Sequence, residues 1–209
     1  MRLPSIQAWL VAQHEANTFR MEGEEPPREQ LARLASAFER VSEGHPLVLT
    51  YTFRALTLDG GVLTIPLIEE CTPIPWGDSR AYYKALWQRL SWEAKDALHL
   101  MAEDDFIWPP GALEHCLGAV DTHIEAEIGH LLATVDAGLI AFHGSLYVFI
   151  AGQPDHPQRI QTLLPNVECW LATEAPGYLR WAWLWLYQSR LGNHGKLLTG
   201  TTRSWTVEA

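Results

Sequence analysis

Residues 121–150 read DTHIEAEIGHLLATVDAGLIAFHGSLYVFI, and this stretch decides the predicted fold. Asp121 is a suitable N-cap for a helix, and Gly138 is a suitable terminator because glycine adopts the left-handed conformation that ends many helices. Two short apolar runs follow, at 139–142 and 146–150, and His143-Gly144-Ser145 separates them. The apolar positions before Gly138 have the spacing of one helical face: Ile124, Ile128, Leu131, Leu132 and Val135. The stretch therefore predicts a helix that leads directly into a two-stranded hairpin.

Two shorter helices are predicted upstream. Ser91 begins the first, and its apolar positions repeat every three or four residues: Ala94, Ala97, Leu98, Met101 and Ala102. Trp108-Pro109-Pro110 introduces the second, which Gly118 ends; its apolar positions are Leu113, Cys116 and Leu117. This order of helix, short helix, longer helix and hairpin is carried by LSWEAKDALHLMA, PPGALEHCLG and LLATVDAGLIAFHGSLYVFI. It resembles the winged helix-turn-helix superfamily, and the resemblance covers residues 91–152.

The N-terminal region, residues 1–90, is predicted to hold helices and a β-hairpin. A helix from Pro27 has one apolar face: Leu31, Leu34, Ala35, Phe38 and Val41. Residues 47–57 alternate apolar and polar side chains, which favours a half-buried strand. The turn signal Asp59-Gly60-Gly61 then predicts a return strand over 62–68.

Residues 153–209 are predicted to form a Trp-rich region that packs on the rest of the chain. The run YLRWAWLWLYQSRL, residues 178–191, is apolar on every side, so we expect a helix buried either inside the fold or in a partner interface. A final strand is predicted over 197–207, with Trp205 facing inward. The expected fold class is α+β, with three parts: residues 1–90, the winged-helix-like module 91–152 and the region 153–209.

Composition narrows the class of protein. The chain has 209 residues, of which 47% are hydrophobic and 19% charged, so it has enough apolar surface to build a core. We expect no membrane association, because no apolar run approaches the length that spans a bilayer. Cys71, Cys116 and Cys169 are isolated and odd in number, which predicts reduced thiols, small core residues and a cytoplasmic location.

Charge is concentrated on the predicted module. Residues 91–150 carry ten acidic side chains and a single base, Lys95, so their net charge is −9, against −2 for residues 1–90 and +1 for residues 151–209. The winged-helix resemblance implies a third helix that enters DNA and a wing that touches phosphate. Phosphate binding needs Lys and Arg, but the exposed side of this predicted helix offers Asp121, Glu125, Glu127 and Asp136. The acidity therefore favours protein–protein interaction over DNA binding.

One stripe of the predicted third helix has the residue types of a metal site. His123, Glu127 and His130 lie at i, i+4 and i+7, and Glu127 and His130 match the Glu-x-x-His spacing of di-metal helix bundles. A solvated helix edge explains the same spacing. Five of the nine histidines lie between His99 and His143 among the acids, which leaves open a pH-dependent surface. No Gly-x-Ser-x-Gly, His-Glu-x-x-His or Cys-x-x-Cys motif is present.

These observations predict a non-catalytic interaction or adaptor protein, built on an acidic winged-helix scaffold and needing neither cofactor nor metal. The expected partner is another protein, either a basic one or a second copy of the chain. Two alternatives remain open: a DNA-associated transcriptional regulator, and a metal-dependent enzyme that uses His123, Glu127 and His130. The candidate interaction surface combines residues of the third helix, the wing and the Trp-rich run: Asp121, His123, Glu125, Glu127, His130, His143, Arg180 and Arg190.

Overall fold

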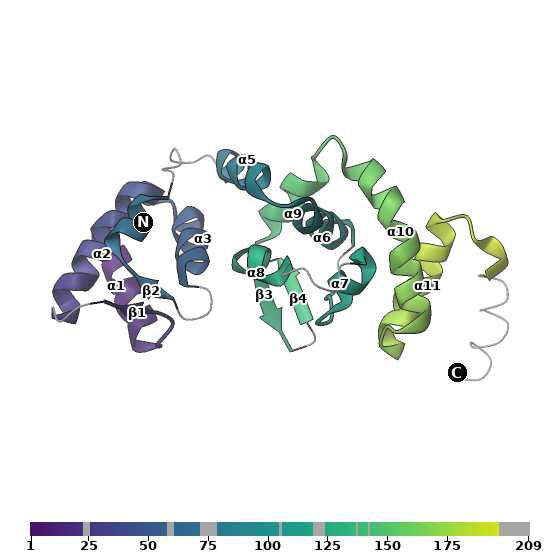
Figure 1. The fold of residues 1–209 in the computed structure, drawn as a ribbon, viewed down its shortest axis with the longest axis horizontal. Helices are drawn as coiled ribbons and strands as arrows, with labels where there is room; N and C mark the ends of the chain where they lie inside the picture. Colours follow the sequence, from purple (N-terminus) through teal and green to yellow (C-terminus); the bar gives the residue numbers. More distant parts are fainter. Residues whose placement is uncertain are drawn as a thin grey trace. The chain divides into compact units, whose positions relative to one another are not determined.

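A computed structural model describes residues 1–22, 26–57, 61–71, 79–104, 106–118, 124–136, 138–141 and 143–196 (Figure 1). The chain divides into two compact units, and the fold of each is mixed helix and strand with a large excess of helix. Unit 1 comprises residues 1–90 and 125–132, and unit 2 comprises residues 91–124 and 133–209. No helix in the described parts of the chain is both long enough and apolar enough to cross a membrane.

Unit 1 is built on a pair of helices, α1 (Leu3–Glu15) and α2 (Pro27–Ser42), which pack against each other. Proline occupies the first turn of α2, and Glu43 and Gly44, both with positive φ, follow its last residue. The predicted apolar face of α2 is confirmed, since every one of its members is buried: Leu31, Leu34, Ala35, Phe38 and Val41.

The predicted strand over 47–57 is wrong, because these residues form helix α3 (Pro46–Thr57). Alternation requires Ala55 to be buried with Phe53 and requires Thr52 to be exposed, whereas Thr52 is buried and Ala55 is exposed. Pro46 begins the helix, where its missing N–H costs nothing. Thr50 and Thr57 donate their hydroxyls to the carbonyls four residues earlier, at 2.9 and 2.8 Å.

The predicted return strand over 62–68 is correct for two residues only. Val62–Leu63 form β2, which pairs in parallel with β1 (Arg20–Met21) instead of with residues 47–57. Ile65–Glu69 form the short helix α4, and the Thr64 hydroxyl accepts the Leu67 N–H as its N-cap. The turn signal lies largely outside the described residues. Helix α5 (Ser79–Arg89) completes this part of the chain.

The first two helices of unit 2 are confirmed. α6 (Trp92–Glu103) is capped by the Ser91 hydroxyl, which accepts the Ala94 N–H at 3.1 Å. α7 (Ala112–Leu117) ends at Gly118, whose φ is +67°. Between them, Trp108 forms an isolated antiparallel bridge with Leu139. The fully buried Trp108 ring stacks on Trp170 and tilts against Phe106, so this bridge joins the strands to the core of the unit.

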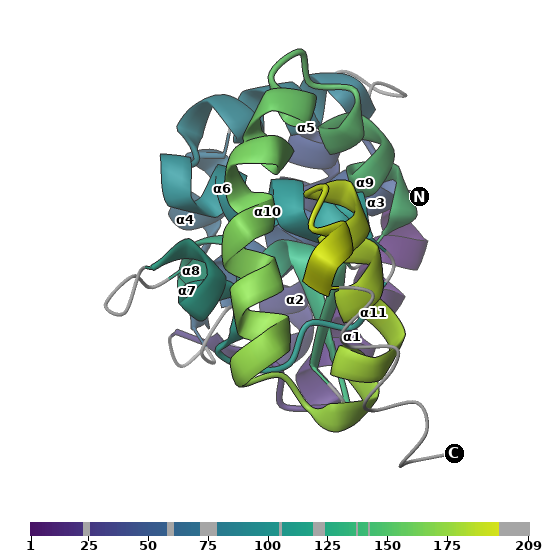
Figure 2. The same ribbon diagram turned by 90° about the vertical axis from the view of Figure 1, so that its right-hand side faces the viewer.

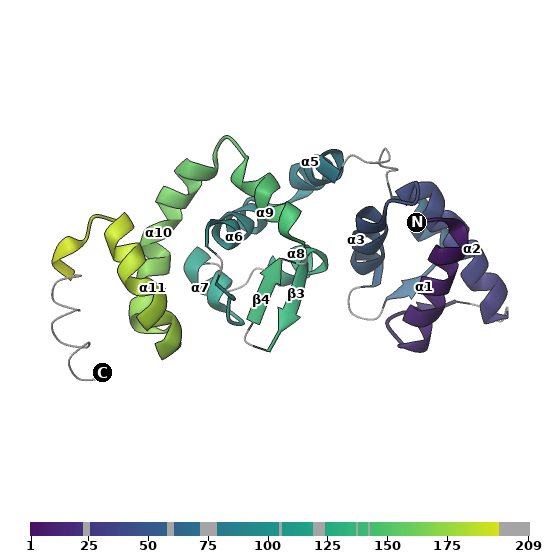
Figure 3. The same ribbon diagram turned by 180° about the vertical axis from the view of Figure 1, so that it is seen from behind.

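The long third helix is wrong in extent. It consists of α8 (Ile124–Ile128) and the 3-10 turn η1 (Gly129–Leu131). The chain then enters the paired strands β3 (Leu132–Val135) and β4 (Gly138–Ala141), which lie side by side in Figure 3. The hairpin tip therefore falls near Asp136, seven residues before the predicted His143-Gly144-Ser145. The residues predicted to face the core as far as Leu132 are nevertheless buried: Ile124, Ile128, Leu131 and Leu132.

The predicted second wing strand, 146–150, is part of helix α9 (Gly144–Ala151). A strand would place Leu146, Val148 and Ile150 on one face, but Leu146 and Ile150 are buried while Val148 is 72% exposed. This is the i, i+4 pattern of a helix. The His143 side chain caps it by accepting the Ser145 N–H at its Nδ1 atom. α9 packs against α6.

The end of the described chain is two helices. α10 (His156–Thr173) runs through Pro165, which lies inside the helix. α11 (Gly177–Arg190) follows, and Gly192, with φ +71°, lies just beyond it. α10 lies alongside α11 and also packs on α6 and α7 (Figure 2). The predicted strand 197–207 and Trp205 lie outside the described residues.

Candidate interaction surface

The outer side of α11 presents three aromatic rings. Tyr178, Trp181 and Trp185 are 58%, 65% and 52% exposed. Their spacing of i, i+3 and i+7 places them on one side of the helix, over a length of about 10 Å. Only Leu179 and Tyr187 of this helix are buried. An apolar helix was expected to be buried inside the fold or in a partner interface, and α11 as the structure describes it is buried on one side only.

The inner side of α11 is anchored by charged hydrogen bonds to the end of α6. Asp104 is buried and accepts three bonds: two from the Arg190 guanidinium at 2.8 and 3.0 Å, and one from the Tyr187 hydroxyl at 2.6 Å. Glu103 lies 3.3 Å from the same guanidinium. Burial and the Asp104 carboxylate raise the pKa of Tyr187, so its hydroxyl stays protonated and donates. This network fixes the direction in which the aromatic side faces.

Two further contacts order the aromatic side itself. Arg180 reaches back to the C-terminal end of α10 and donates to the carbonyl of Leu171 at 3.1 Å, which neutralises part of the negative end of that helix. The Trp185 Nε1–H donates to the Ala182 carbonyl within α11 at 2.8 Å. Because its polar atom is thereby satisfied, the Trp185 indole presents an apolar ring to solvent.

The basic side chains of unit 2 that the structure describes form ion pairs or hydrogen bonds. Arg159 pairs with Asp96, Arg190 with Asp104, and Lys196 with Glu168. Arg180 is bonded to carbonyl oxygens, and Lys95 also has interaction partners. In residues 91–104, 106–118 and 143–196 there is accordingly no cluster of uncommitted bases that would neutralise phosphates.

Only part of the predicted interaction surface falls on residues that the structure describes. Asp121 and His123 lie outside the described residues, as does the side chain of Glu125. Glu127 is half-buried, and His130 is buried in η1. His143 is exposed, but it is the N-cap of α9 and not the tip of a wing. Arg180 and Arg190 lie on one helix, where both are bonded to other parts of unit 2.

Of the candidate metal ligands, the structure describes Glu127 and His130 but not His123. Burial and the nearby Arg54 guanidinium lower the pKa of His130 to about 4. Arg54 itself donates to the carbonyls of Gly129 and Leu132, on either side of that histidine. Among the residues that the structure describes, no three His, Cys, Asp or Glu side chains are grouped to hold a metal ion. His123 is not among them, so the metal hypothesis stays a prediction.

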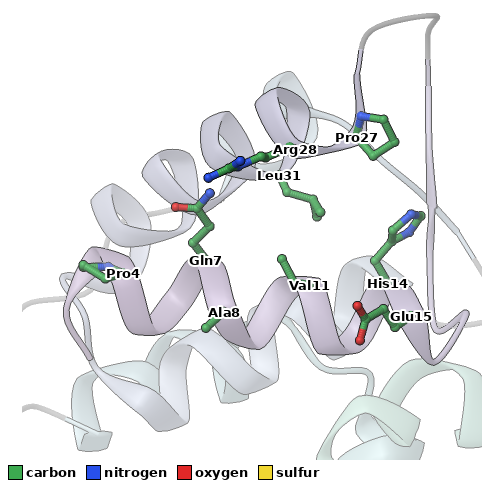
Figure 4. A pocket seen from close by; sticks show the side chains of 9 residues that line it. All are labelled: Pro4, Gln7, Ala8, Val11, His14, Glu15, Pro27, Arg28 and Leu31. Carbon is green, nitrogen blue, oxygen red and sulfur yellow. The ribbon is translucent and has the colours of Figure 1, made fainter.

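A second surface feature is an open groove of about 600 Å³ in unit 1 (Figure 4). Gln7 and Val11 of α1 face Arg28 and Leu31 of α2 across it. Its lining mixes apolar side chains with a base, an acid and a histidine, and no cluster in it selects a class of ligand. The α11 surface is chemically more uniform, so we take it as the candidate site.

The sequence singled out residues 178–191, which contain this surface, but did not indicate which side of the helix is exposed. The spacing of Tyr178, Trp181 and Trp185 was visible, yet Trp183, Leu184 and Leu186 fill the remaining sides with equally apolar residues. No polar stripe marks the boundary between the inner and outer sides. The comparisons with known proteins give no further guide, since no family model, no curated protein and no solved structure matches this chain.

Proposed function

We propose that this chain is a non-catalytic protein–protein interaction module, and that the aromatic side of α11 is its docking surface. The exposure of Tyr178, Trp181 and Trp185 on one side of a single helix is the observation that carries this proposal. Each such ring carries roughly 150–250 Å² of surface, so the exposed parts of the three rings form an apolar patch of roughly 300 Å², the size of the largest patch on a typical monomer, which is often functional.

The residue types and their order support a protein partner. Trp and Tyr are enriched among interface residues whose truncation costs about 2 kcal/mol or more. Here Tyr187 and Arg190 on the inner side of α11 are hydrogen-bonded to Asp104, so the aromatic side is already ordered in the unbound chain. Little conformational freedom then has to be lost on association, which favours binding.

The absence of opposing charge supports a second copy of the chain as the partner. The two arginines on the same helix as the aromatic rings, Arg180 and Arg190, are bonded within the unit. Two copies that meet through this surface would therefore bring apolar rings together without placing like charges opposite each other. In a two-fold symmetric pairing, each copy contributes the same rings to the contact.

The scaffold in this proposal is winged-helix-like. Within unit 2, the order α6, Trp108 bridge, α7 and β3–β4 hairpin supports it. Engaged bases and the acidic composition argue against a DNA-binding use of that scaffold. The metal-dependent alternative depends on His123 and has no support from the described residues.

Sedimentation velocity of the full chain over a range of micromolar concentrations tests this function. We expect the wild type to self-associate, and Trp181→Ala with Trp185→Ala to weaken the association at least tenfold, about 1.4 kcal/mol. Trp92→Ala is the matched control, because Trp92 is 63% exposed on α6 and lies outside the docking surface. A wild type that stays monomeric, or a control that weakens association equally, would reject the proposal.

A further inference from the structure

Two buried histidines meet where α10 begins. His99, in the middle of α6, is fully buried, and His156, the first residue of α10, is nearly so. Their Nδ1 atoms are 2.8 Å apart, and their ring centroids are 5.0 Å apart. The two residues are far apart in the sequence, so this contact ties α10 to α6 within unit 2.

The contact limits how many protons the pair can hold. At 2.8 Å one Nδ1 atom donates its hydrogen and the other accepts it through a lone pair. If both Nδ1 atoms carried a hydrogen, two N–H groups would point at each other and the contact would break. The pair is therefore stable when neutral or singly charged, and unstable when doubly charged.

The outer nitrogens face carboxylates. His156 Nε2 lies 3.3 Å from Glu103 Oε2, and His99 Nε2 lies 3.9 Å from Asp155 Oδ2. One assignment satisfies these distances in the neutral pair: His99 donates from Nδ1 to His156, and His156 donates from Nε2 to Glu103. A first extra proton then enters at His99 Nε2, beside Asp155. A second extra proton could bind only at His156 Nδ1. That nitrogen already accepts the hydrogen bond from His99, so binding the proton there breaks the contact.

A bridging metal ion does not fit this spacing. Two imidazole nitrogens on a tetrahedral zinc ion, each at about 2.0–2.1 Å, are roughly 3.3 Å apart, farther than these two atoms. The neighbouring carboxylates also lie on the opposite sides of the rings, where they cannot complete the same coordination sphere. A shared proton accounts for the geometry.

The titratable and charged groups near the His99–His156 pair lie on the helices that pack around it. On α6, Asp96 is bonded to Arg159 of α10, and Glu103 also contacts Arg190 of α11. On α7, His115 is paired with Glu174 at 3.2 Å, away from the pair, and Glu114 is the other charged residue. α9 offers only Tyr147. Burial, His156 and Arg159 lower the pKa of His99, and Asp155 and Asp96 oppose this only in part.

We propose that His99 and His156 form a one-proton clasp that holds the start of α10 on α6 at neutral pH and opens when a second proton enters in mildly acidic solution. The clasped state binds one proton fewer than the open state. Acidification below about pH 6.5, the ordinary histidine pKa, therefore favours opening. Because α11 packs on α10, opening would also loosen the support of the aromatic side.

Hydrogen exchange of the full chain tests the clasp. Between pH 7 and pH 5, after correction for the intrinsic exchange rate, we expect the opening constant of the first turns of α10 to rise by up to tenfold per pH unit. His156→Asn keeps a hydrogen-bond acceptor near the same place but cannot hold the second proton, so its opening constant should rise less steeply with acidity than that of the wild type. His194→Asn, at an exposed histidine, is the control and should behave as the wild type.

Nitrogen NMR of the wild-type imidazoles tests the same proposal without a substitution. One ring should carry its hydrogen at Nδ1, the other should lack it there, and the two should titrate in separate steps. Two rings of the same tautomer that titrate together near pH 6.5, or a His156→Asn chain with the wild-type pH slope, would overturn the clasp.

Discussion

Burial determines how His130 contributes to the pH dependence of folding stability. Its ring lies in η1 within unit 1, and burial followed by the Arg54 guanidinium lowers its pKa to about 4. The histidine is therefore neutral in the folded chain at pH 5, although it would be protonated in the unfolded chain, where the ordinary pKa is about 6.5. Such a group contributes stability that is present above pH 6.5 and is lost as pH falls toward 4.

We expect the free energy of unfolding of the wild type to fall by about 2 kcal/mol between pH 7 and pH 5 through His130 alone. His130→Gln removes this titration, so its pH dependence over the same interval should be smaller by that amount. Urea unfolding at the two pH values measures the difference. His194→Gln serves as the exposed control, and an unchanged slope in His130→Gln would contradict the buried, neutral assignment.

The three cysteines show how far residue type alone predicts whether a side chain is buried. The three cysteines were predicted to be small core residues, and this is right only for Cys116, which is fully buried. Burial raises the pKa of its thiol to about 12. Cys71 is half-buried and Cys169 is exposed. Both α7 and α10 have an apolar face, but Cys169 falls outside the buried positions of α10.

At the scale of elements, local signals predicted helices well where caps and an apolar face coincide. α2 and α6 begin, and α7 ends, close to the predicted residues because Pro27, Ser91 and Gly118 act on the backbone nearby. α3 and α9 were predicted as strands. Over the five residues 146–150, period-two and helical spacing overlap, so the sequence alone does not separate them. The segment 47–57 has eleven residues, which is the length of a helix, and Val48 and Leu56 interrupt its alternation.

The β3–β4 hairpin requires glycine at position 138. Its φ is +145°, and a Cβ atom there would lie 2.0 Å from the carbonyl oxygen of Trp108. That carbonyl accepts the Leu139 N–H at 2.7 Å, so any added side chain would disrupt the bridge. The sequence marked Gly138 as a helix end, and the structure gives it a different role.

Gly138→Ala should therefore lower the free energy of unfolding by about 3 kcal/mol or more, since strained backbone and a broken bridge combine. Thermal or urea unfolding measures the loss. Gly144→Ala is the matched control: no atom lies within 4 Å of its added Cβ, so its effect should stay within about 0.5 kcal/mol. Equal stability of the two variants would show that the bridge carries little of the fold.

At the scale of the whole molecule, the chain builds two cores instead of one. Phe53 lies at the centre of the aromatic packing of unit 1, with Trp9, Phe19 and Phe38 around it at centroid distances of 4.8, 5.5 and 6.1 Å. Trp108 has the corresponding place in unit 2, between Phe106 and Trp170. Each unit thus contains its own set of packed aromatic contacts.

Phe53→Ala tests this division. Truncation of a buried phenylalanine costs about 3–5 kcal/mol. We expect the loss of hydrogen-exchange protection to concentrate in α1, α2 and α3, with much less change in α6 and α10. Mass spectrometry of exchanged peptides from the full chain gives the comparison. A uniform loss across both units would mean that the chain unfolds as one cooperative body.

The sequence by itself determined the helix-forming segments that carry their own caps, the apolar faces of α2 and α6, and the acidic character that argues against DNA. These are local or additive properties of the chain, so neighbouring residues are enough to fix them. Only the tertiary structure decided that 47–57 and 146–150 are helices and that Asp104 anchors α11. The same holds for the outward direction of Tyr178, Trp181 and Trp185. Those outcomes depend on which distant surface buries which side, and a pattern of residue types does not contain that information.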